Sequence, residues 1–277
     1  MKDPRTEAQI REHYEVEKEL ANRLRNAPKE ARGALYRAVY DELFRRVPHH
    51  SALSRKVSRE MSRENLKWQL NLLSPFLKES VTFLEVGPGD CALAFEVAKL
   101  VKKVYAIDVS EAITSASSAP RNFQLILSDG SSIRVPKGSI DVVYSNQLME
   151  HLHPDDAVGQ LENILDALAP GGVYLCVTPN KLNGPHDISS DFDSVATGFH
   201  MREYTVGELR GLFQKVGFSK IEMCVGGNGK YWRCPTLPAV LCETALQILP
   251  SKLCRAIAGS WWVRGVIGVR LVGFKSA

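Results

Sequence analysis

The chain has 277 residues, 44% of them hydrophobic, so it can bury one large core and carry an appendage. Its formal net charge of +4 is too small to indicate nucleic-acid binding, and its six scattered cysteines form no C-x-x-C pair, which excludes a zinc-finger pattern and a secreted disulfide scaffold. The charged N-terminus does not resemble a signal peptide, and no apolar run reaches the ~20 residues that span a bilayer, so we expect a cytoplasmic protein with reduced thiols.

Residues 1–80 are expected to form a helical N-terminal extension to a main domain over 81–277. Apolar residues spaced i, i+1, i+4 and i+5 over 28–47 predict an amphipathic helix that ends before Pro48. A basic stretch over 45–67 follows. It is typical of a solvated helical face and linker, and it also suits an anionic acceptor or partner, so both interpretations stay open.

Residues 81–91, VTFLEVGPGDC, are the most informative segment. An apolar strand pattern reaches an acid at Glu85 and turns through Gly87 and Gly89 into a helical pattern. Two closely spaced glycines let the backbone approach a ligand where a Cβ would clash, and the following helix offers free N–H groups. The segment therefore predicts a loop that binds a nucleoside cofactor.

This loop fits two classes of cofactor. Gly87-x-Gly89-x-x-Ala92, with Asp108 about 20 residues further on, satisfies the relaxed dinucleotide fingerprint. A pyrophosphate beside the Glu85 carboxylate would be repelled, however, whereas the ammonium group of S-adenosylmethionine would be attracted. Asp108 suits ribose hydroxyls in either case. The glycines leave the choice open, and Glu85 favours S-adenosylmethionine.

Beyond the loop, strand and helix patterns alternate, which predicts a parallel sheet with helices on both faces. A capping box at Thr205 and Glu208 marks the start of one helix. The expected strands are 81–86, 103–108, 123–127, 140–145, 172–178, 219–224 and 268–274, and the expected helices are 91–101, 111–117, 156–168 and 205–216.

The segment 225–267 interrupts this alternation. It is rich in Gly, Pro, Trp and apolar residues and has helical runs near 237–249 and 251–260. Three interpretations stay open: packing onto the sheet, a lid or wall of an acceptor site, and a peripheral contact with a membrane. Arg264 and Arg270 argue against insertion into lipid.

The order of these landmarks resembles the class I S-adenosylmethionine-dependent methyltransferases of the small-molecule branch. EVGPGD resembles the first motif of that family, VYAIDVS the second and LSDGSSI the segment after the third strand; SIDVVYSNQLMEHL, LAPGGVYLCVTPN and FHMREYT resemble the later motifs. The match covers about 81–224, with closure to 274. It implies a Rossmann-like, seven-stranded, mostly parallel sheet with an antiparallel last strand, and S-adenosyl-L-methionine as cofactor. The chain departs from the family at Cys91, where a third glycine is frequent.

The resemblance also implies roles for individual cofactor-binding residues. Glu85 would support the methionine ammonium, while Gly87 and Gly89 admit the backbone to the ligand. Asp108, which is followed by Val109, would accept hydrogen bonds from both ribose hydroxyls.

The remaining cofactor-binding residues follow the third and fourth strands. Asp129 would accept from the adenine amino group, with Gly130 as a nearby backbone donor. Asn146 and Gln147 would line the methionine end.

The catalytic candidates are two histidines. A hydroxyl acceptor needs a general base, and histidine suits neutral pH. His151 in MEHLHPDD and His200 in FHMREYT both follow strands at their carboxyl ends, where open α/β sheets bind ligands, although either could instead only fix a loop. No acid–histidine cluster has metal-ligand spacing, so no metal is expected. The SNQL sequence after the fourth strand lacks the signatures of DNA methyltransferases.

We therefore expect methyl transfer by in-line displacement to a small-molecule acceptor, with oxygen favoured over nitrogen or carbon. The helical extension and the 225–267 insertion would wall the acceptor pocket. An NAD(P)-dependent oxidoreductase and a non-catalytic S-adenosylmethionine-binding partner protein are the alternatives. The oligomeric state is left open.

Overall fold

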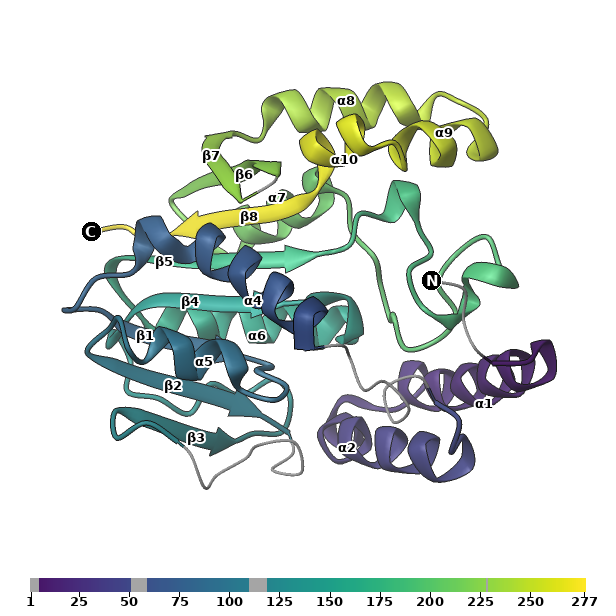
Figure 1. Ribbon diagram of the computed structural model, residues 1–277, viewed down its shortest axis with the longest axis horizontal. Coiled ribbons are helices and arrows are strands. Elements are labelled where there is room, and N and C mark those ends of the chain that lie inside the picture. Colours follow the sequence, from purple (N-terminus) through teal and green to yellow (C-terminus); the bar gives the residue numbers. More distant parts are fainter. Residues whose placement is uncertain (1–4, 51–58, 110–118, 228) are drawn as a thin grey trace.

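The computed structural model describes residues 5–50, 59–109, 119–227 and 229–277. These residues form a sheet with the strand order β3-β2-β1-β4-β5-β8-β6-β7, and helices cover both of its faces (Figure 1). The strands are β1 (Thr82–Val86), β2 (Lys103–Asp108), β3 (Phe123–Leu127), β4 (Ile140–Asn146), β5 (Leu168–Thr178), β6 (Lys220–Gly227), β7 (Lys230–Pro235) and β8 (Val269–Phe274). The α-helices are α1 (Glu7–Arg25), α2 (Lys29–Arg46), α4 (Arg59–Leu73), α5 (Ala92–Val97), α6 (Pro154–Ala167), α7 (Val206–Val216), α8 (Leu237–Gln247), α9 (Ser251–Ala258) and α10 (Trp261–Ile267).

The first five strands are parallel, and β1 lies between β2 and β4. The chain therefore proceeds outward in both directions from β1, which makes the carboxyl ends of β1 and β4 the switch point where such sheets bind ligands. One buried core cluster includes residues of α6 and α7 and another includes residues of α5, so each face of the sheet is packed separately. The expected helix over 111–117 lies outside the described residues.

The expected fold class is confirmed, but the strand count of seven is wrong by one. β8 runs antiparallel between β5 and β6, as expected for the last strand, and β7 adds an antiparallel edge strand beside β6. The segment KYWRCP of β7 is short, largely exposed and ends at Pro235, so it lacks a clear apolar alternation. The Asn-Gly pair that precedes it in the sequence is the hairpin signal that points to it.

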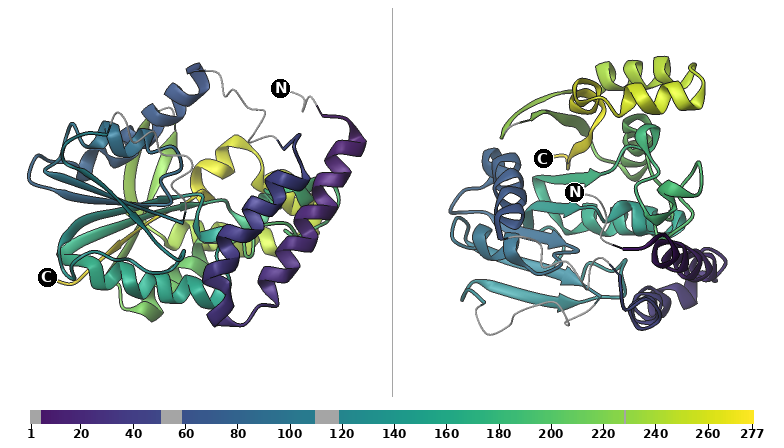
Figure 2. Two further views of the ribbon diagram at one scale, coloured as in Figure 1. Left: turned by 90° about the horizontal axis from the view of Figure 1, so that it is seen from below. Right: turned by 45° about the vertical axis from the view of Figure 1, so that its right-hand side comes forward.

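The helices of the N-terminal 80 residues occupy two places. α1 and α2 form a hairpin beyond the carboxyl edge of the sheet. α4 lies over one face of the sheet, where it contacts α5 and β7 (Figures 1 and 2). The helix expected over 28–47 is α2. α1 begins with a capping box between Thr6 and Gln9.

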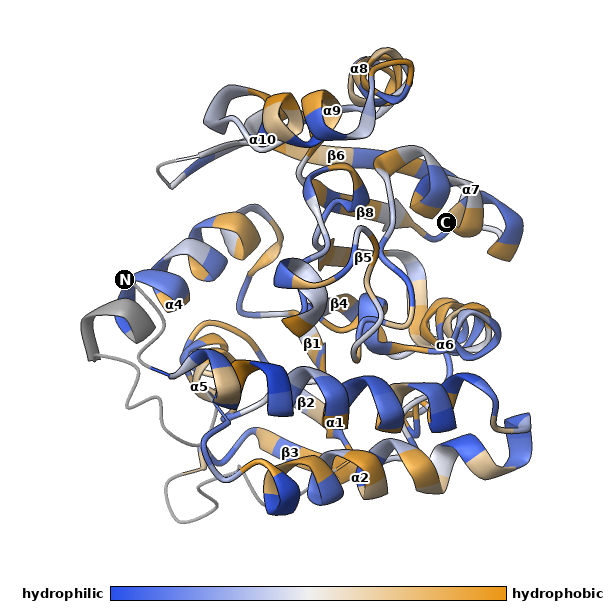
Figure 3. Ribbon diagram, turned by 90° about the vertical axis from the view of Figure 1, so that its right-hand side faces the viewer, coloured by the Kyte–Doolittle hydropathy of each residue, from blue (hydrophilic) through white to orange (hydrophobic). Residues whose placement is uncertain are grey.

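The segment expected to be an insertion folds as β7 followed by a layer of three helices, α8, α9 and α10. α8 packs on α7 and α10 packs on β6, with Leu246, Cys254, Ala258 and Ile267 buried between the helices. The layer lies at the opposite end of the sheet from α1 and α2, and Figure 3 shows apolar residues along its helices. None of the helices in the described residues is both long and apolar enough to cross a membrane.

Candidate functional site

The loop after β1 lies at the switch point, where a sheet of this kind is predicted to hold its cofactor in a crevice outside the strand ends. Gly87 and Gly89 have φ angles of +71° and +55°, which favour glycine. A Cβ on Gly87 would lie 3.2 Å from Leu148 in the loop after β4, whereas a Cβ on Gly89 would meet no described atom within 4 Å. The glycines thus allow a close approach between two loops at Gly87 and leave open space at Gly89.

The backbone at Cys91 has a conformation that favours glycine. It is the N-cap of α5, it is fully buried, and its φ of +60° lies in the left-handed region. A side chain in that region costs on the order of 1 kcal/mol or more relative to glycine. The chain keeps the backbone conformation of the loop without the third glycine.

Glu85 is the residue whose environment is most unusual. Its side chain is buried, and Oε2 has no hydrogen-bond partner among the described residues. Burial raises the pKa of the Glu85 carboxyl to about 8, and the nearby charges of Asp90 and Asp108 contribute to the increase. A buried carboxyl with an unpartnered oxygen is suited to a cationic group of a ligand.

The ends of β2 and β4 place the next predicted residues around the crevice. Asp108 is half-buried at the end of β2, where its Oδ1 accepts a hydrogen bond from the backbone N–H of Val109 at 2.7 Å. Asn146 ends β4, and its Nδ2 lies 3.4 Å from Oε1 of Gln69 on α4. Gln147 follows with a φ of +54°, a strained conformation for a residue with a side chain.

Asp129 and Gly130 follow β3, and α2 covers them. A Cβ on Gly33 would lie 3.3 Å from the Asp129 Cβ, and one on Gly130 would lie 3.2 Å from the Tyr36 ring. The Asp129 carboxylate also caps its own turn: Oδ1 accepts from both backbone and side chain of Ser131 and from the backbone of Ser132, and Oδ2 accepts from the Ser132 hydroxyl. Burial raises the pKa of Asp129, but these hydrogen bonds outweigh it and lower the pKa to about 2. The adenine contact of Asp129 stays a prediction.

Two cavities lie next to the crevice. The larger, of about 530 Å³, begins at Gln147 and is lined by Trp68 of α4, by the end of β5 and by residues of the 225–267 segment, including Tyr231, Trp261 and Arg264. The smaller, of about 390 Å³, lies between the N-terminal helices and the loops after β4 and β5. His186 lines both cavities, so it marks their common boundary.

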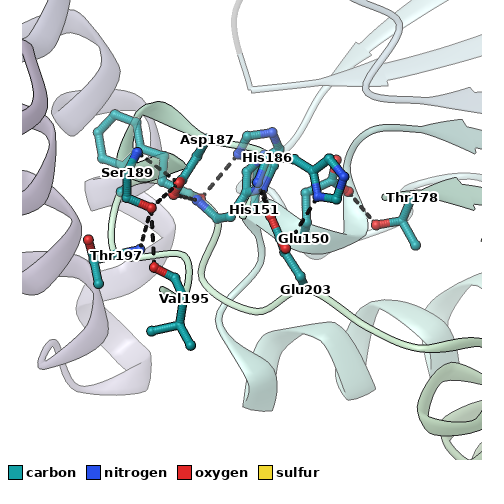
Figure 4. A network of polar contacts seen from close by, with 12 residues as sticks. Glu150, His151, Thr178, His186, Asp187, Ser189, Val195, Thr197 and Glu203 are labelled. Carbon is teal, nitrogen blue, oxygen red and sulfur yellow. Dashed lines mark hydrogen bonds and ion pairs between the residues drawn. The ribbon is translucent and has the colours of Figure 1, made fainter. Parts of the chain in front are cut away.

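The two predicted histidines come together in the smaller cavity. The rings of His151 and His200 are edge-to-face, with centroids 4.8 Å apart. Glu203 accepts a hydrogen bond from His200 Nδ1 at 2.7 Å and lies 3.3 Å from His186 Nδ1. Figure 4 shows Glu150, His151, His186 and Glu203 gathered between the N-terminal helices and the sheet.

Helix α1 holds the loop that carries His200. Arg25 donates to the backbone carbonyls of Thr197 and Gly198 at 2.8 and 2.7 Å, and Glu17 accepts from the backbone N–H of Phe199 at 2.9 Å. The N-terminal extension therefore positions a candidate catalytic residue as well as covering the cavity.

The pKa values of the two histidines are shifted in opposite directions. Burial and the neighbouring charge of His200 lower the pKa of His151 to about 4. Burial also lowers the pKa of His200, but the Glu203 hydrogen bond and the Glu150 carboxylate outweigh it, so the pKa is raised. Burial raises the pKa of Glu150 itself.

Sequence reasoning missed several residues of this site. His186, like His200, lies between β5 and α7, so the argument that placed His200 after the carboxyl end of a strand applied to His186 as well. Glu150 adjoins His151 in the sequence. Two groups of side chains also lie close enough to hold a metal ion, Glu150/His151/His200 and His13/Glu17/His50. In each group two members are close in sequence, and the third, His200 or His50, comes from a separate segment, so the sequence pattern did not reveal either group.

Comparisons with known proteins agree on one fold. The family model described as "Methyltransferase domain" matches residues 54–223, which is more than half of the chain. None of the curated proteins matches the sequence.

Solved structures with related folds have low sequence identity. A methyltransferase in a complex with the Trm112 activator of Haloferax volcanii is 16% identical with a TM-score of 0.56, and the match covers 79% of this chain and 93% of that one. A Haemonchus contortus phosphoethanolamine N-methyltransferase 2 is 16% identical with a TM-score of 0.51, covering 76% of this chain and 53% of that one. An S-adenosylmethionine-dependent methyltransferase from Mesorhizobium loti is 16% identical with a TM-score of 0.50, covering 75% and 98%. At these identities the likeness establishes the fold.

Proposed function

This chain belongs to the class I S-adenosylmethionine-dependent methyltransferases, and on that premise we propose that it methylates a hydroxyl group of a small molecule. Family membership establishes the enzyme class and the cosubstrate. It sets aside the NAD(P)-dependent oxidoreductase and the non-catalytic partner protein. The acceptor class, the methylated atom and the roles of individual residues are our proposals.

The observation that carries the cofactor assignment is the unpartnered, buried oxygen of Glu85. S-adenosylmethionine has a sulfonium and an ammonium, so it supplies the cation that this carboxyl lacks. We propose that Glu85 supports the methionine end, with Asn146 and Gln147 nearby, and that Asp108 accepts from the ribose hydroxyls. When bound, the cofactor supplies an activated methyl group; the residues of the chain orient it and exclude water.

We place the acceptor in the larger cavity, because that cavity begins at Gln147, the residue it shares with the cofactor crevice. Trp68 and Tyr231 provide flat apolar walls, and Arg264 and Arg270 provide positive charge. An aromatic or otherwise planar acceptor with a hydroxyl or acidic substituent fits this lining. Part of the bound acceptor would extend past His186 into the smaller cavity, since His186 lines both cavities.

His151 and His200 are proposed to act on the reacting hydroxyl. Each ring uses Nδ1 in a hydrogen bond within the protein, so Nε2 is the atom available to the acceptor. Removal of the hydroxyl proton makes the oxygen a better nucleophile for in-line attack on the methyl group. Nitrogen acceptors need no such deprotonation when neutral, which is why these histidines favour oxygen.

The test has two stages. Calorimetry should show micromolar binding of S-adenosylmethionine and none of NAD. Matched pairs of planar acceptors that differ only in a hydroxyl or an amino group are then incubated with the protein and S-adenosylmethionine, and the gain of one methyl group is measured by mass spectrometry. Methylation of the hydroxyl member of a pair supports the proposal. Methylation of amines alone would refute O-methylation, and binding of NAD instead of S-adenosylmethionine would refute the cofactor assignment.

A further inference from the structure

We propose that Glu150, His151 and His200 form a binding site for a divalent transition-metal cation, at which the acceptor oxygen would also bind. This inference deepens the proposed function and rests on it, because it changes how the two histidines act on the acceptor. The ligand atoms of the three residues lie within 4.8 Å of one another. Glu150 and His151 come from the turn after β4, and His200 comes from the loop before α7.

Hydrogen bonds determine which imidazole nitrogen carries the proton. Nδ1 of His151 lies 3.1 Å from both the backbone carbonyl oxygen of Phe199 and the Tyr40 hydroxyl. We assign the proton to Nδ1, because the carbonyl oxygen can only accept whereas the hydroxyl needs no acceptor there. Nδ1 of His200 donates in the same way to the Glu203 carboxylate at 2.7 Å. In each neutral ring Nε2 then carries a lone pair. A carbonyl or carboxylate that orients a histidine through Nδ1 is the usual support for a metal ligand that binds through Nε2.

Glu150 supplies the third ligand. Its side chain is fully buried, its Oε2 accepts from the Thr178 hydroxyl at 2.8 Å, and its Oε1 has no hydrogen-bond partner among the described residues. A buried carboxylate oxygen without a donor is costly, and the two nearby imidazoles in their neutral forms offer it lone pairs and no proton. A divalent cation satisfies all three atoms at once.

The chemistry of the ligands selects the metal. Two imidazoles and one carboxylate suit Zn²⁺, Mn²⁺, Fe²⁺ or Co²⁺, whereas Mg²⁺ and Ca²⁺ prefer oxygen ligands throughout. His151 and His200 line the smaller cavity, so the open coordination positions would face the space that the acceptor enters past His186. The cation would bind the acceptor hydroxyl and lower its pKa, so that the proton leaves to water. The alkoxide or phenolate would then form the O–CH3 bond as the S–CH3 bond of the sulfonium breaks, and the neutral thioether S-adenosylhomocysteine would leave with the electron pair.

The neighbouring group His13/Glu17/His50 does not share these features. Arg5 donates to Nδ1 of His13 at 2.7 Å, so the His13 proton is on Nε2 and is donated to Glu17 at 2.8 Å. The other Glu17 oxygen accepts from the backbone of Phe199. The His13 lone pair and both Glu17 oxygens are thus occupied, which makes this group a structural network and a useful control.

The experiment measures metal binding directly. The full chain is purified with a chelator, dialysed and titrated with Zn²⁺ and Mn²⁺ by calorimetry, and Co²⁺ is added to record the visible absorption of a nitrogen- and oxygen-ligated ion. We expect one cation per chain with a dissociation constant below 10 µM, taking the ordinary affinity of three-ligand sites as roughly this order or tighter. His200→Ala and Glu150→Gln should each weaken binding at least tenfold; Glu150→Gln keeps the shape of the side chain and its contact with Thr178. His153→Ala, in the same turn, and His13→Ala should bind as the wild type does.

Each outcome bears on the proposal. Absence of binding in the wild type, equal binding in His200→Ala and wild type, or loss of binding in His13→Ala alone would overturn it. S-adenosylmethionine affinity and methyl transfer are measured on the same samples. Metal-free protein that still binds S-adenosylmethionine and transfers methyl at the full rate would refute the metal site and leave the proposed function standing, whereas failure to methylate any hydroxyl with metal bound would refute the function alone.

A second proposal rests on a separate observation, the surface of the α8–α10 layer. Its exposed large apolar residues are Leu237, Leu241, Ile248, Leu253, Trp261, Trp262 and Val266. The acid of this layer, Glu243, is buried and accepts from the backbone of Val206 and Gly207, whereas Lys252 and Arg264 are exposed. We propose that this layer docks peripherally on a bilayer that contains anionic lipid, because exposed tryptophans with a cationic, acid-free surface match that interface.

Vesicle flotation tests the docking surface. Wild-type protein should float with phosphatidylcholine vesicles that contain 30% phosphatidylglycerol and much less with pure phosphatidylcholine. Ile248→Ser/Trp262→Ser and Lys252→Glu should lower the bound fraction at least fivefold, whereas Lys215→Glu, an exposed lysine on α7, should not. No flotation of the wild type, or a dimer in light scattering that the double variant converts to a monomer without any vesicle binding, would overturn the proposal.

Discussion

Arg32 of α2 and Asp156 of α6 form a buried, bidentate ion pair that joins the N-terminal helices to the sheet domain. Arg32 Nε lies 2.7 Å from Asp156 Oδ2, and Nη2 lies 2.8 Å from Oδ1. Tyr36 donates to the same carboxylate at 2.9 Å. Because α2 also covers Asp129 and Gly130, this pair ties the covering helix to the sheet domain beside the loop after β3.

Removal of one partner of this pair should be more costly than removal of both. Arg32→Met leaves a buried carboxylate without its cation, so we expect a loss of about 3–5 kcal/mol in the free energy of unfolding. Arg32→Met/Asp156→Leu should recover more than half of that loss. Urea unfolding followed by fluorescence measures both. Additive losses in the double variant would show that the two residues do not act as a pair.

Glu85→Gln should alter the pH dependence of stability. The folded pKa of about 8 lies above the ordinary value of 4.5, so the folded state binds this proton more tightly than the unfolded chain does. The stabilising contribution is complete below pH 4.5 and is lost as the pH rises to about 8, at up to about 1.4 kcal/mol per pH unit. Ligand-free Glu85→Gln should therefore unfold at a higher temperature than the wild type at pH 8, and by a smaller margin at pH 5. A margin independent of pH would contradict the raised pKa.

The same group should couple cofactor binding to proton release. Between pH 6 and 7.5 Glu85 is mostly neutral in the free protein, and a bound cation favours its ionised form. We expect S-adenosylmethionine affinity to rise with pH in this range and about one proton to be released, measured by calorimetry in buffers of different ionisation enthalpy. In Glu85→Gln the affinity should be lower and independent of pH.

Asp108→Ala should weaken S-adenosylmethionine binding on the order of 100-fold, because two hydrogen bonds to a charged acceptor are lost. The change is measured as the dissociation constant of S-adenosylmethionine, with the melting temperature of the free protein recorded beside it. Asp166→Ala, an exposed acid of α6 that pairs with Lys137, is the matched control and should bind normally. Equal affinities for the two variants would remove Asp108 from the ribose site.

Tyr231 and Trp232 offer a matched pair for the acceptor cavity. Tyr231 lines the cavity, whereas its neighbour Trp232 is 62% exposed. Tyr231→Ala should raise the acceptor KM at least tenfold with unchanged affinity for S-adenosylmethionine, and Trp232→Ala should change neither. An unchanged KM for Tyr231→Ala would place the acceptor elsewhere.

The glycine loop, the strands beside it and the start of α7 could be predicted from the sequence, because they depend on local interactions. Gly87, Gly89 and Glu85 act within a few residues of one another, and the bounds of β2 and β3 agree with the apolar runs that predict them. The capping box of Thr205 and Glu208 is likewise a contact over three residues, and it begins α7 as expected. Such features depend on short-range sterics and hydrogen bonds, so a single sequence contains them.

The acceptor side was decided by tertiary structure alone. Glu150 and His200 are fifty residues apart in sequence, and the larger cavity joins Trp68 to Arg270, so no local pattern links them. The unpartnered oxygen of Glu150 and the hydrogen-bond partners of His151 and His200 exist only once Thr178, Phe199 and Glu203 are packed around them. The sequence by itself thus determined the family and the glycine turn after β1, because a backbone turn needs only its own residues. The fold decided which side chains meet in the two cavities and in the candidate metal site, because those places are made of side chains from distant segments.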